Sequence, residues 1–387
     1  MFLNSCTTEK NAFLNKKYHY VTVRYNGYFN GNEAYKLAEK KIAEQHKDDF
    51  DELLDVFKYG NETNNKDQYS NLDRAMTKGA KMIDRHSMKF KVKTQDVEFN
   101  NMIDDCYLLI GKARFLKYDF DAAKETFIYI KNTYETGLER YKANLWLIMT
   151  YIYQENYVDA ETTIKSIKSS MEEELDKEPS FPKKLLDDFA LVEAIYLKRS
   201  GQFDLAIPAF EKAVKILKKR KLKKRIQFIL AQLYEEQGNK TKASELYKLV
   251  AQKASNYELQ FNSRISLATT YEGDGKEVVK VLEKMLKDIK NNEYQDQIYF
   301  ALAKIYEKQE NEELAISSYK LAAKTSVSNP KQKGKSFLAL GNYYFDKQDY
   351  ILASDYYDST LVVITQDFPN FDEIKDKKES LKGLVKH

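Results

Sequence analysis

The chain has 387 residues, of which 32% are charged and 13% aromatic, and its formal net charge is only +4. With 13 glycines and 5 prolines it has too few turn formers for a many-stranded sheet, so the composition favours an all-α protein built from amphipathic helices. The mild charge argues against nucleic-acid binding, and no apolar run approaches the roughly 18 residues of a membrane-spanning helix. Two cysteines and four scattered histidines give neither a disulfide framework nor metal-ligand spacing. We therefore expect no metal and no cofactor.

Residues 1–11 are predicted to form a tether. Leu3-Asn4-Ser5-Cys6 has the form of a bacterial lipobox, in which an acylated Cys anchors a domain at a membrane surface. A signal peptide also needs a basic start and an apolar core, which five residues cannot supply. Two interpretations stay open: the true start lies upstream of Met1, or Cys6 is an ordinary thiol.

Residues 12–100 are predicted to form divergent N-terminal helical repeats, with helices over Tyr18–Ile42 and Leu72–His86 and a polar loop over Asn61–Asp67. The stretch Asn26–Glu33 is unusually rich in Gly and Asn. It has two interpretations: the tight turn of a helix pair, since Gly and Asn tolerate positive φ, or a docking segment. The candidates for partner contacts here are Tyr28, Phe29, Asn30 and Asn32.

Residues 101–364 show internal self-similarity at a spacing of about 37 residues. In each copy a small residue is followed by an aromatic or aliphatic one, then by Ala and a bulky residue further on. Six copies are clear: Ile110, Gly111, Ala123, Phe127; Leu147, Tyr151, Ala160, Ile164; Ala194, Leu197, Ala206, Phe210, Ala213; Leu230, Ala231, Tyr234, Ala243, Tyr247; Leu302, Ala303, Tyr306, Ala315, Tyr319, Ala322; Leu340, Gly341, Tyr344, Ala353, Tyr357. This is the spacing of the tetratricopeptide repeat, in which a small residue lets two antiparallel helices approach and an aromatic ring fills the remaining gap.

Several details refine this frame. A weaker copy contains Leu267, Ala268 and Tyr271, and its turn at Glu272–Gly275 is short. The spacing stretches to 46 residues between Ala160 and Ala206, where Glu178–Pro182 marks an extra loop. Second helices are expected to begin near Asp121, Asp159 and Asp204, as N-caps or first-turn acids. Residues 365–387 are expected to form a capping helix or the start of a further C-terminal region. The sequence thus predicts a right-handed superhelix of about eight helix pairs.

Repeat arrays of this kind bind partners along the concave face lined by the first helix of each pair. The position after the small residue is predicted to face that groove, which gives Lys112, Gln232, Lys304 and Asn342 as candidate partner-binding residues. The alternative for each is an ordinary solvated helix face.

A second candidate surface is a basic run, predicted at an inter-repeat turn. It consists of Lys218, Lys219, Arg220, Lys221, Lys223, Lys224 and Arg225. It could bind an acidic protein patch, anionic lipid or wall polymer, or it could be a solvated, self-repelling turn. No aromatic platform accompanies it, so we do not interpret it as a nucleic-acid site.

Specific segments resemble one known family. These segments are Ala12–His19, Arg24–Ala34, Leu72–Ala75, His86–Met88, Tyr356–Thr360 and Phe368–Phe371. They resemble, in order, the SprE/PorW family of tetratricopeptide lipoproteins of Bacteroidetes gliding motility and type IX secretion. The resemblance implies an outer-membrane lipoprotein on the periplasmic side, lipidated at Cys6. It implies as partners the translocon barrel and the peptidoglycan-associated ring. Two departures are the missing hydrophobic signal core and a chain shorter than is usual in the family.

The sequence therefore predicts a non-enzymatic scaffold of that secretion machinery, with a generic cytosolic repeat adaptor as the alternative. An enzyme is disfavoured, because no nucleophile elbow, phosphate loop or metal cluster accompanies the many carboxylates.

Overall fold

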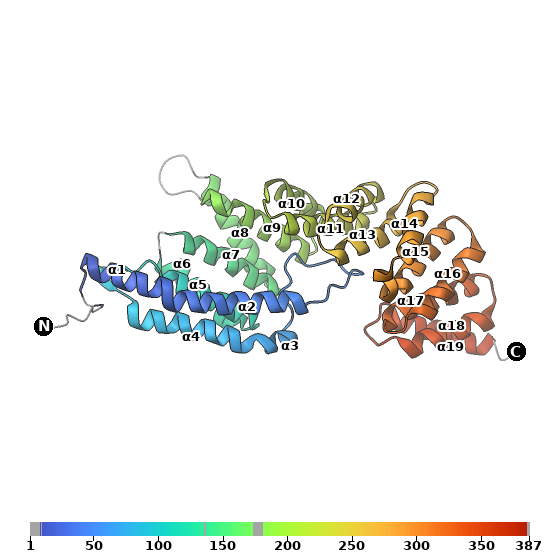
Figure 1. Ribbon diagram of the computed structural model, residues 1–387, viewed down its shortest axis with the longest axis horizontal. Coiled ribbons are helices and arrows are strands. Elements are labelled where there is room, and N and C mark those ends of the chain that lie inside the picture. The colour runs from blue at the N-terminus through green and yellow to red at the C-terminus, as the bar shows by residue number, and fades with distance from the viewer. Residues whose placement is uncertain (1–7, 9, 135–136, 173–180, 385–387) are drawn as a thin grey trace. The chain divides into compact units, whose positions relative to one another are not determined.

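The computed structural model describes residues 8, 10–134, 137–172 and 181–384, and these residues are overwhelmingly helical (Figure 1). The chain divides into two compact units, Met1–Lys219 and Arg220–His387. Both units are built from antiparallel helix pairs, which confirms the predicted all-α repeat fold.

The first unit begins with one long helical rod. It consists of α1 (Phe13–Thr22), a π-helical segment η1 (Val23–Tyr28) and α2 (Phe29–Gln45), which follow one another without a break. The tight turn that was one interpretation of Asn26–Glu33 is therefore wrong. Buried residues recur at every fourth position, at His19, Val23, Gly27, Gly31 and Tyr35. An α-helix with 3.6 residues per turn would rotate this stripe off its partner, whereas a wider π turn keeps it on one side.

The rod packs along α4 (Tyr69–His86), beside which it lies in Figure 1. Glycine makes the close approach possible: a Cβ at Gly31 would lie 3.1 Å from Cβ of Lys78 and 3.2 Å from the carbonyl oxygen of Ala75. Ring nitrogens of His19 and His86, 2.7 Å apart, tie α1 to the end of α4. Small side chains in this stretch thus serve helix packing and not a turn.

Three shorter elements complete the N-terminal part. The polar stretch expected as a loop over Asn61–Asp67 instead contains α3 (Glu62–Asn65) and the start of a 3-10 turn η2 (Lys66–Gln68). A hairpin of β1 (Lys89–Val92) and β2 (Gln95–Glu98), which the sequence pattern does not predict, follows α4.

Three helix pairs complete the first unit. They are α5 (Ile103–Leu116) with α6 (Phe120–Thr133), α7 (Leu138–Tyr153) with α8 (Tyr157–Glu172), and α9 (Leu186–Arg199) with α10 (Phe203–Ile216), with a 3-10 turn η3 (Lys183–Leu185) before α9. The steric rule read from the sequence holds at Gly111, where an added Cβ would lie 2.5 Å from the Phe127 ring. Asp121, Asp159 and Asp204 all lie in first turns of second helices, as predicted.

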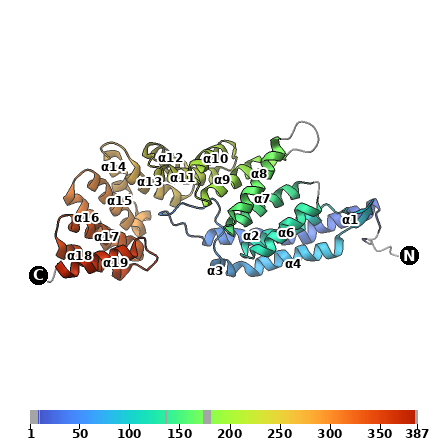
Figure 2. The same ribbon diagram turned by 180° about the vertical axis from the view of Figure 1, so that it is seen from behind.

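The second unit contains four more pairs and a final helix. They are α11 (Arg220–Glu236) with α12 (Lys240–Lys253), α13 (Tyr257–Thr270) with α14 (Lys276–Leu286), α15 (Gln295–Lys308) with α16 (Glu312–Thr325), and α17 (Pro330–Asp346) with α18 (Tyr350–Val363); a 3-10 segment η4 (Ile289–Tyr294) precedes α15. The helix α19 (Phe371–Leu384) lies beside α18, as Figure 2 also shows, and buries Ile374 and Leu381 against the core around Tyr357. The weak repeat exists, with a shortened second helix α14.

Candidate protein-binding surfaces

The first-helix face of the first unit is covered by the protein's own chain. The segment 46–61, which connects α2 to α3, runs across it, and Leu54 and Val56 in this segment are each only 3% exposed. The Tyr59 ring lies 5.4 Å from that of Phe115 on α5 and 6.0 Å from that of Trp146 on α7, between ring centroids. The groove predicted to receive a partner is therefore already filled in this unit.

An ion-paired clamp on α9 holds this segment. Lys198 is only 7% exposed, and its Nζ donates to the carbonyl oxygen of Leu54 (2.8 Å) and to a carboxylate oxygen of Asp55 (3.1 Å). Arg199 donates to the other carboxylate oxygen of Asp55 at 2.6 Å. A buried ammonium is tolerated only with such partners, so the clamp fixes both the position and the backbone course of the segment.

Lys112 shows the consequence for the predicted groove residues. Its ammonium lies 4.3 Å from the Tyr35 ring centroid and 5.3 Å from that of Trp146, between the N-terminal rod and α7. Burial lowers the pKa of Lys112 below its ordinary value, partly offset by Glu39. Lys112 therefore stabilises the packing inside its unit, and the expectation that it lines an open groove is wrong.

The three corresponding residues of the second unit differ among themselves. Gln232 is buried at 8% exposure, which contradicts its expected place on an open groove. The side chain of Lys304 is 41% exposed and pairs with Glu307 at 2.9 Å. Asn342 accepts a hydrogen bond from the Tyr357 hydroxyl at 2.9 Å. Lys304 is therefore only partly exposed, and the partner-binding role of all three residues stays a prediction.

A recurring hydrogen bond joins the two helices in three pairs of the second unit. The Tyr of the second helix donates its hydroxyl to a polar residue of its own first helix in three pairs: Tyr247 to Glu235, Tyr319 to Glu307 and Tyr357 to Asn342, at 2.9 Å each. Desolvation raises the pKa of Tyr357 to about 12. These hydroxyls therefore stay protonated at physiological pH and act as hydrogen-bond donors that link the two helices of each pair.

The four candidates near the N-terminus lie on one helical stretch but do not share a face. Tyr28 is half-buried and hydrogen-bonded to Asp105, and burial raises its pKa well above the ordinary value. Phe29 is 52% exposed, whereas Asn30 donates to the backbone of Asn26 at 2.7 Å, one turn earlier. Asn32 is half-buried. Of the four, only Phe29 is largely exposed, and the partner-binding role of all four stays a prediction.

The basic run is mostly helical, which corrects its predicted place at a turn. Lys218 and Lys219 follow α10, but the other five basic residues, Arg220, Lys221, Lys223, Lys224 and Arg225, form the first turns of α11. Cations at a helix N-terminus oppose the helix dipole. Burial and the nearby Lys253 and Lys223 lower the pKa of Lys224, and its Nζ donates to Gln227 at 2.8 Å. Whether the run binds an anionic partner stays a prediction.

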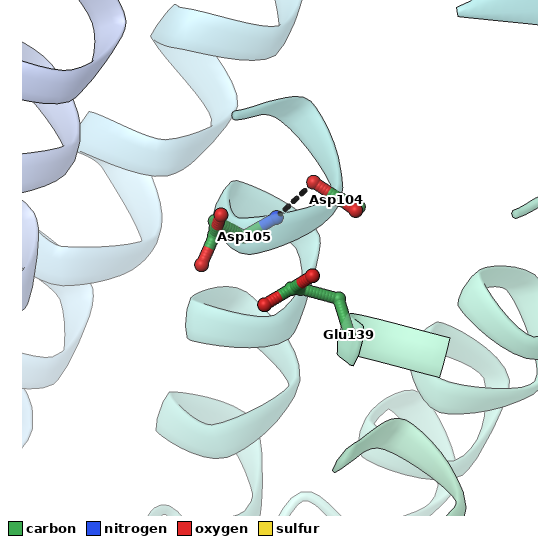
Figure 3. A group of neighbouring side chains, drawn as sticks. All are labelled: Asp104, Asp105 and Glu139. Carbon is green, nitrogen blue, oxygen red and sulfur yellow. Dashed lines mark hydrogen bonds between the residues drawn. The ribbon is translucent and has the colours of Figure 1, made fainter. Parts of the chain in front are cut away.

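A group of three carboxylates, shown in Figure 3, escaped sequence analysis. Asp104 and Asp105 open α5 and Glu139 opens α7, and one oxygen of each lies within 4.8 Å of the others. Burial and the two neighbouring carboxylates raise the pKa of Asp104 to about 7; burial and Glu139 raise that of Asp105 to about 6. Oxygen donors at this spacing suit a divalent cation, but protons compete for them near neutral pH, and Lys142 already pairs with Glu139 at 3.0 Å. Asp105 and Glu139 are 34 residues apart in the sequence, so no short sequence motif contains the whole group.

A cleft of about 890 Å³ between α8, α9 and α10 was also not predicted from the sequence. Its walls combine apolar side chains such as Phe189 and Leu205 with lysines, of which Lys165 pairs with Glu161 at 2.8 Å. It lies where the repeat spacing stretches from 37 to 46 residues. That irregular spacing was the one sequence signal that two neighbouring pairs do not pack in the usual way.

Cys6 lies outside the described residues, as does most of the extra loop before Pro182. Among the residues that the structure does describe, every helix is too short or too polar to cross a membrane.

The antiparallel pairs, with a small residue of one helix facing an aromatic ring of the other, define a helical-repeat class of protein that mediates protein–protein interaction. Tetratricopeptide-repeat family profiles match residues 191–258 and 296–326. The chain therefore contains tetratricopeptide repeats, and these indicate protein partners.

Solved structures with similarity include a tetratricopeptide repeat protein from Parabacteroides merdae ATCC 43184, at 9% identity over 90% of this chain and 99% of that one, with a TM-score of 0.37. BtubC (BKLC) from P. vanneervenii is 19% identical over 58% of this chain and 84% of that one, with a TM-score of 0.30. A chain of the APC/C hetero-tetramer Cut9–Hcn1 is 12% identical over 98% of this chain and 72% of that one, with a TM-score of 0.36. No curated protein matches the sequence.

Proposed function

We propose that this chain is a non-enzymatic scaffold of a type IX secretion and gliding-motility machinery, anchored by a lipid on Cys6 at the periplasmic face of the outer membrane. Its proposed partners are the translocon barrel and the peptidoglycan-associated ring. The observation that carries the proposal is the resemblance of the segment Ala12–Ala34 to the SprE/PorW family, because a generic repeat does not require Phe29-Asn30-Gly31-Asn32-Glu33.

The geometry of that segment supports a scaffold role. Its glycines fit the rod closely onto α4, and Phe29 of the same segment stays 52% exposed on the opposite side. The segment thus both builds the first pair and leaves a side chain available to other proteins.

The test is cross-linked affinity capture from native membranes, with wild-type chain and Cys6→Ala compared. The proposal expects the wild-type chain in the outer-membrane fraction with secretion components bound, and it expects Cys6→Ala to become soluble. A wild-type protein that is wholly soluble, with no such components bound, would exclude the proposal and favour the cytosolic adaptor. Sequencing upstream of Met1 separates the two further, because export requires an in-frame basic and apolar leader.

A further inference from the structure

The N-terminal rod is apolar on two opposite faces. One face is buried against α4, through Val23, Gly27, Gly31 and Tyr35. The other face is open, and from Leu14 onward its large apolar side chains recur every three or four residues. They are Phe13 (76% exposed), Leu14 (74%), Tyr18 (48%), Val21 (41%), Tyr25 (67%) and Phe29 (52%). We call this set the outer stripe.

Apart from Tyr18, whose ring centroid lies 6.5 Å from that of His86 on α4, the outer stripe is not required by the contact with α4, because the buried face already supplies it. A single exposed apolar residue is ordinary, but a continuous apolar patch on a soluble surface marks an interaction site. Phe13 to Phe29 span about 24 Å at 1.5 Å per residue. This length matches about four turns of a second helix laid alongside.

Within the rod itself, the charged residues around the outer stripe have one sign, although Asp105 of α5 lies close enough to Arg24 to add to the rise in its pKa that the hydrogen bond with Tyr20 causes. No Asp or Glu occurs between residues 10 and 32, whereas Lys10, Lys16, Lys17 and Arg24 fall in that interval. The guanidinium of Arg24 lies 5.4 Å from the Tyr25 ring centroid and 5.7 Å from that of Tyr20, so its charge is held beside the stripe. Lys17 is exposed next to Tyr18. The surface is therefore aromatic and positive together.

From this complementarity we infer that the outer stripe docks an acidic amphipathic helix of a partner protein. A second copy of this chain would bring like charges together. Tyr, Phe and Arg are the residues that carry binding energy at protein interfaces. Four basic residues spread over 23 positions fall short of the dense clusters that bind anionic membranes. The inference rests on the proposed scaffold function and names the chemistry of one partner segment.

The test uses the full chain and a fluorescent synthetic helix of about 20 residues, with Leu on one face and Glu on the other. Anisotropy should show binding that weakens as salt rises. Replacing Phe13, Tyr25 and Phe29 together by Ser should weaken binding at least about tenfold. The pair Lys17→Glu and Arg24→Glu should weaken it and remove most of the salt dependence. As a matched control, Val327→Ser with Val362→Ser, at positions 92% and 84% exposed, should leave binding unchanged.

Four outcomes would overturn the inference. The first is equal binding of a matched peptide that carries Lys in place of Glu. The second is unchanged binding by the triple Ser variant when its circular dichroism melt matches that of the wild type. The third is that the chain binds phosphatidylcholine–phosphatidylglycerol vesicles but not the acidic peptide, and that the triple variant no longer binds these vesicles. The fourth is a dimer in sedimentation that the triple variant abolishes. If the chain does not bind the peptide but the triple variant still captures native partners, the docking surface is wrong and the proposed scaffold function stands. If the chain binds the peptide but captures no native partners, the docking surface stands and the proposed scaffold function is wrong.

Discussion

At the scale of single residues, the buried carboxyl of Asp104 makes folding depend on pH. Its pKa in the folded chain is about 7, above the ordinary value of 3.8, because burial disfavours the anion and Asp105 and Glu139 repel it. The folded state therefore binds more protons than the unfolded state between about pH 4 and pH 7. Asp104 contributes its full stability below about pH 4 and loses it as pH rises through 7.

Asp104→Asn should remove this loss. At about 1.4 kcal/mol per pKa unit the upper bound is roughly 4 kcal/mol, and we expect a gain of about 1–3 kcal/mol in unfolding free energy at pH 8 and almost none at pH 4. Asn can still accept the hydrogen bond that Asp105 N–H gives to Oδ1 at 2.9 Å. Urea unfolding of both proteins across this pH range measures the difference. A constant offset between the two curves at every pH would contradict the assignment.

Asp55 is the residue that keeps the groove of the first unit filled. Asp55→Ala leaves the Lys198 ammonium, 7% exposed, without its carboxylate, and should cost about 3 kcal/mol of unfolding free energy. Trp146, the single tryptophan, lies 6.0 Å from the Tyr59 ring, so its emission should also change as the segment loosens.

The matched control for Asp55→Ala is Asp73→Ala. Asp73 pairs with Lys117 at 2.6 Å but its side chain is 54% exposed, so its loss should cost less than about 1 kcal/mol. Equal losses of stability in the two variants, with Trp146 emission unchanged in both, would show that the clamp does not hold the segment.

At the scale of elements, the helix pairs could be predicted because their signal is local and repeated. Gly111 facing Phe127 and Gly341 facing Tyr357 are single contacts within one pair, at the spacing that the sequence shows. The covered groove could not be predicted, because the contact of Asp55 with Lys198 joins residues more than 140 positions apart. The conformation of Asn26–Glu33 could not be predicted for another reason. Gly occurs both in turns and at close helix contacts, and only the position of α4 decides between the two.

The rod and α4 depend on that close packing at Gly31. Gly31→Val would place methyl groups against the backbone of Ala75, where even a Cβ lies 3.2 Å from the carbonyl oxygen, so α2 must move away from α4. We expect a loss of about 1–3 kcal/mol in unfolding free energy. Lys40→Val, at an exposed position of the same helix, controls for the helix propensity of Val. Comparable effects of the two changes in urea unfolding would refute close packing as the role of Gly31.

At the scale of the whole molecule, the two units differ in what reinforces them. The first unit is held by the N-terminal rod and by segment 46–61, whereas the second relies on repeat pairs and on α19. Repeat proteins whose parts differ in stability lose the single cooperative transition of small domains. The units are therefore expected to unfold at different urea concentrations.

Trp146 allows this to be measured in the intact chain, because it lies in the first unit and reports that unit alone. Circular dichroism at 222 nm follows helices of both units, so it should show two transitions, of which only one coincides with Trp146 emission. Asp55→Ala should move the coincident transition to lower urea by an amount that corresponds to about 3 kcal/mol, and should leave the other in place. A single transition seen identically by both probes, shifted as a whole by Asp55→Ala, would mean that the chain unfolds as one body.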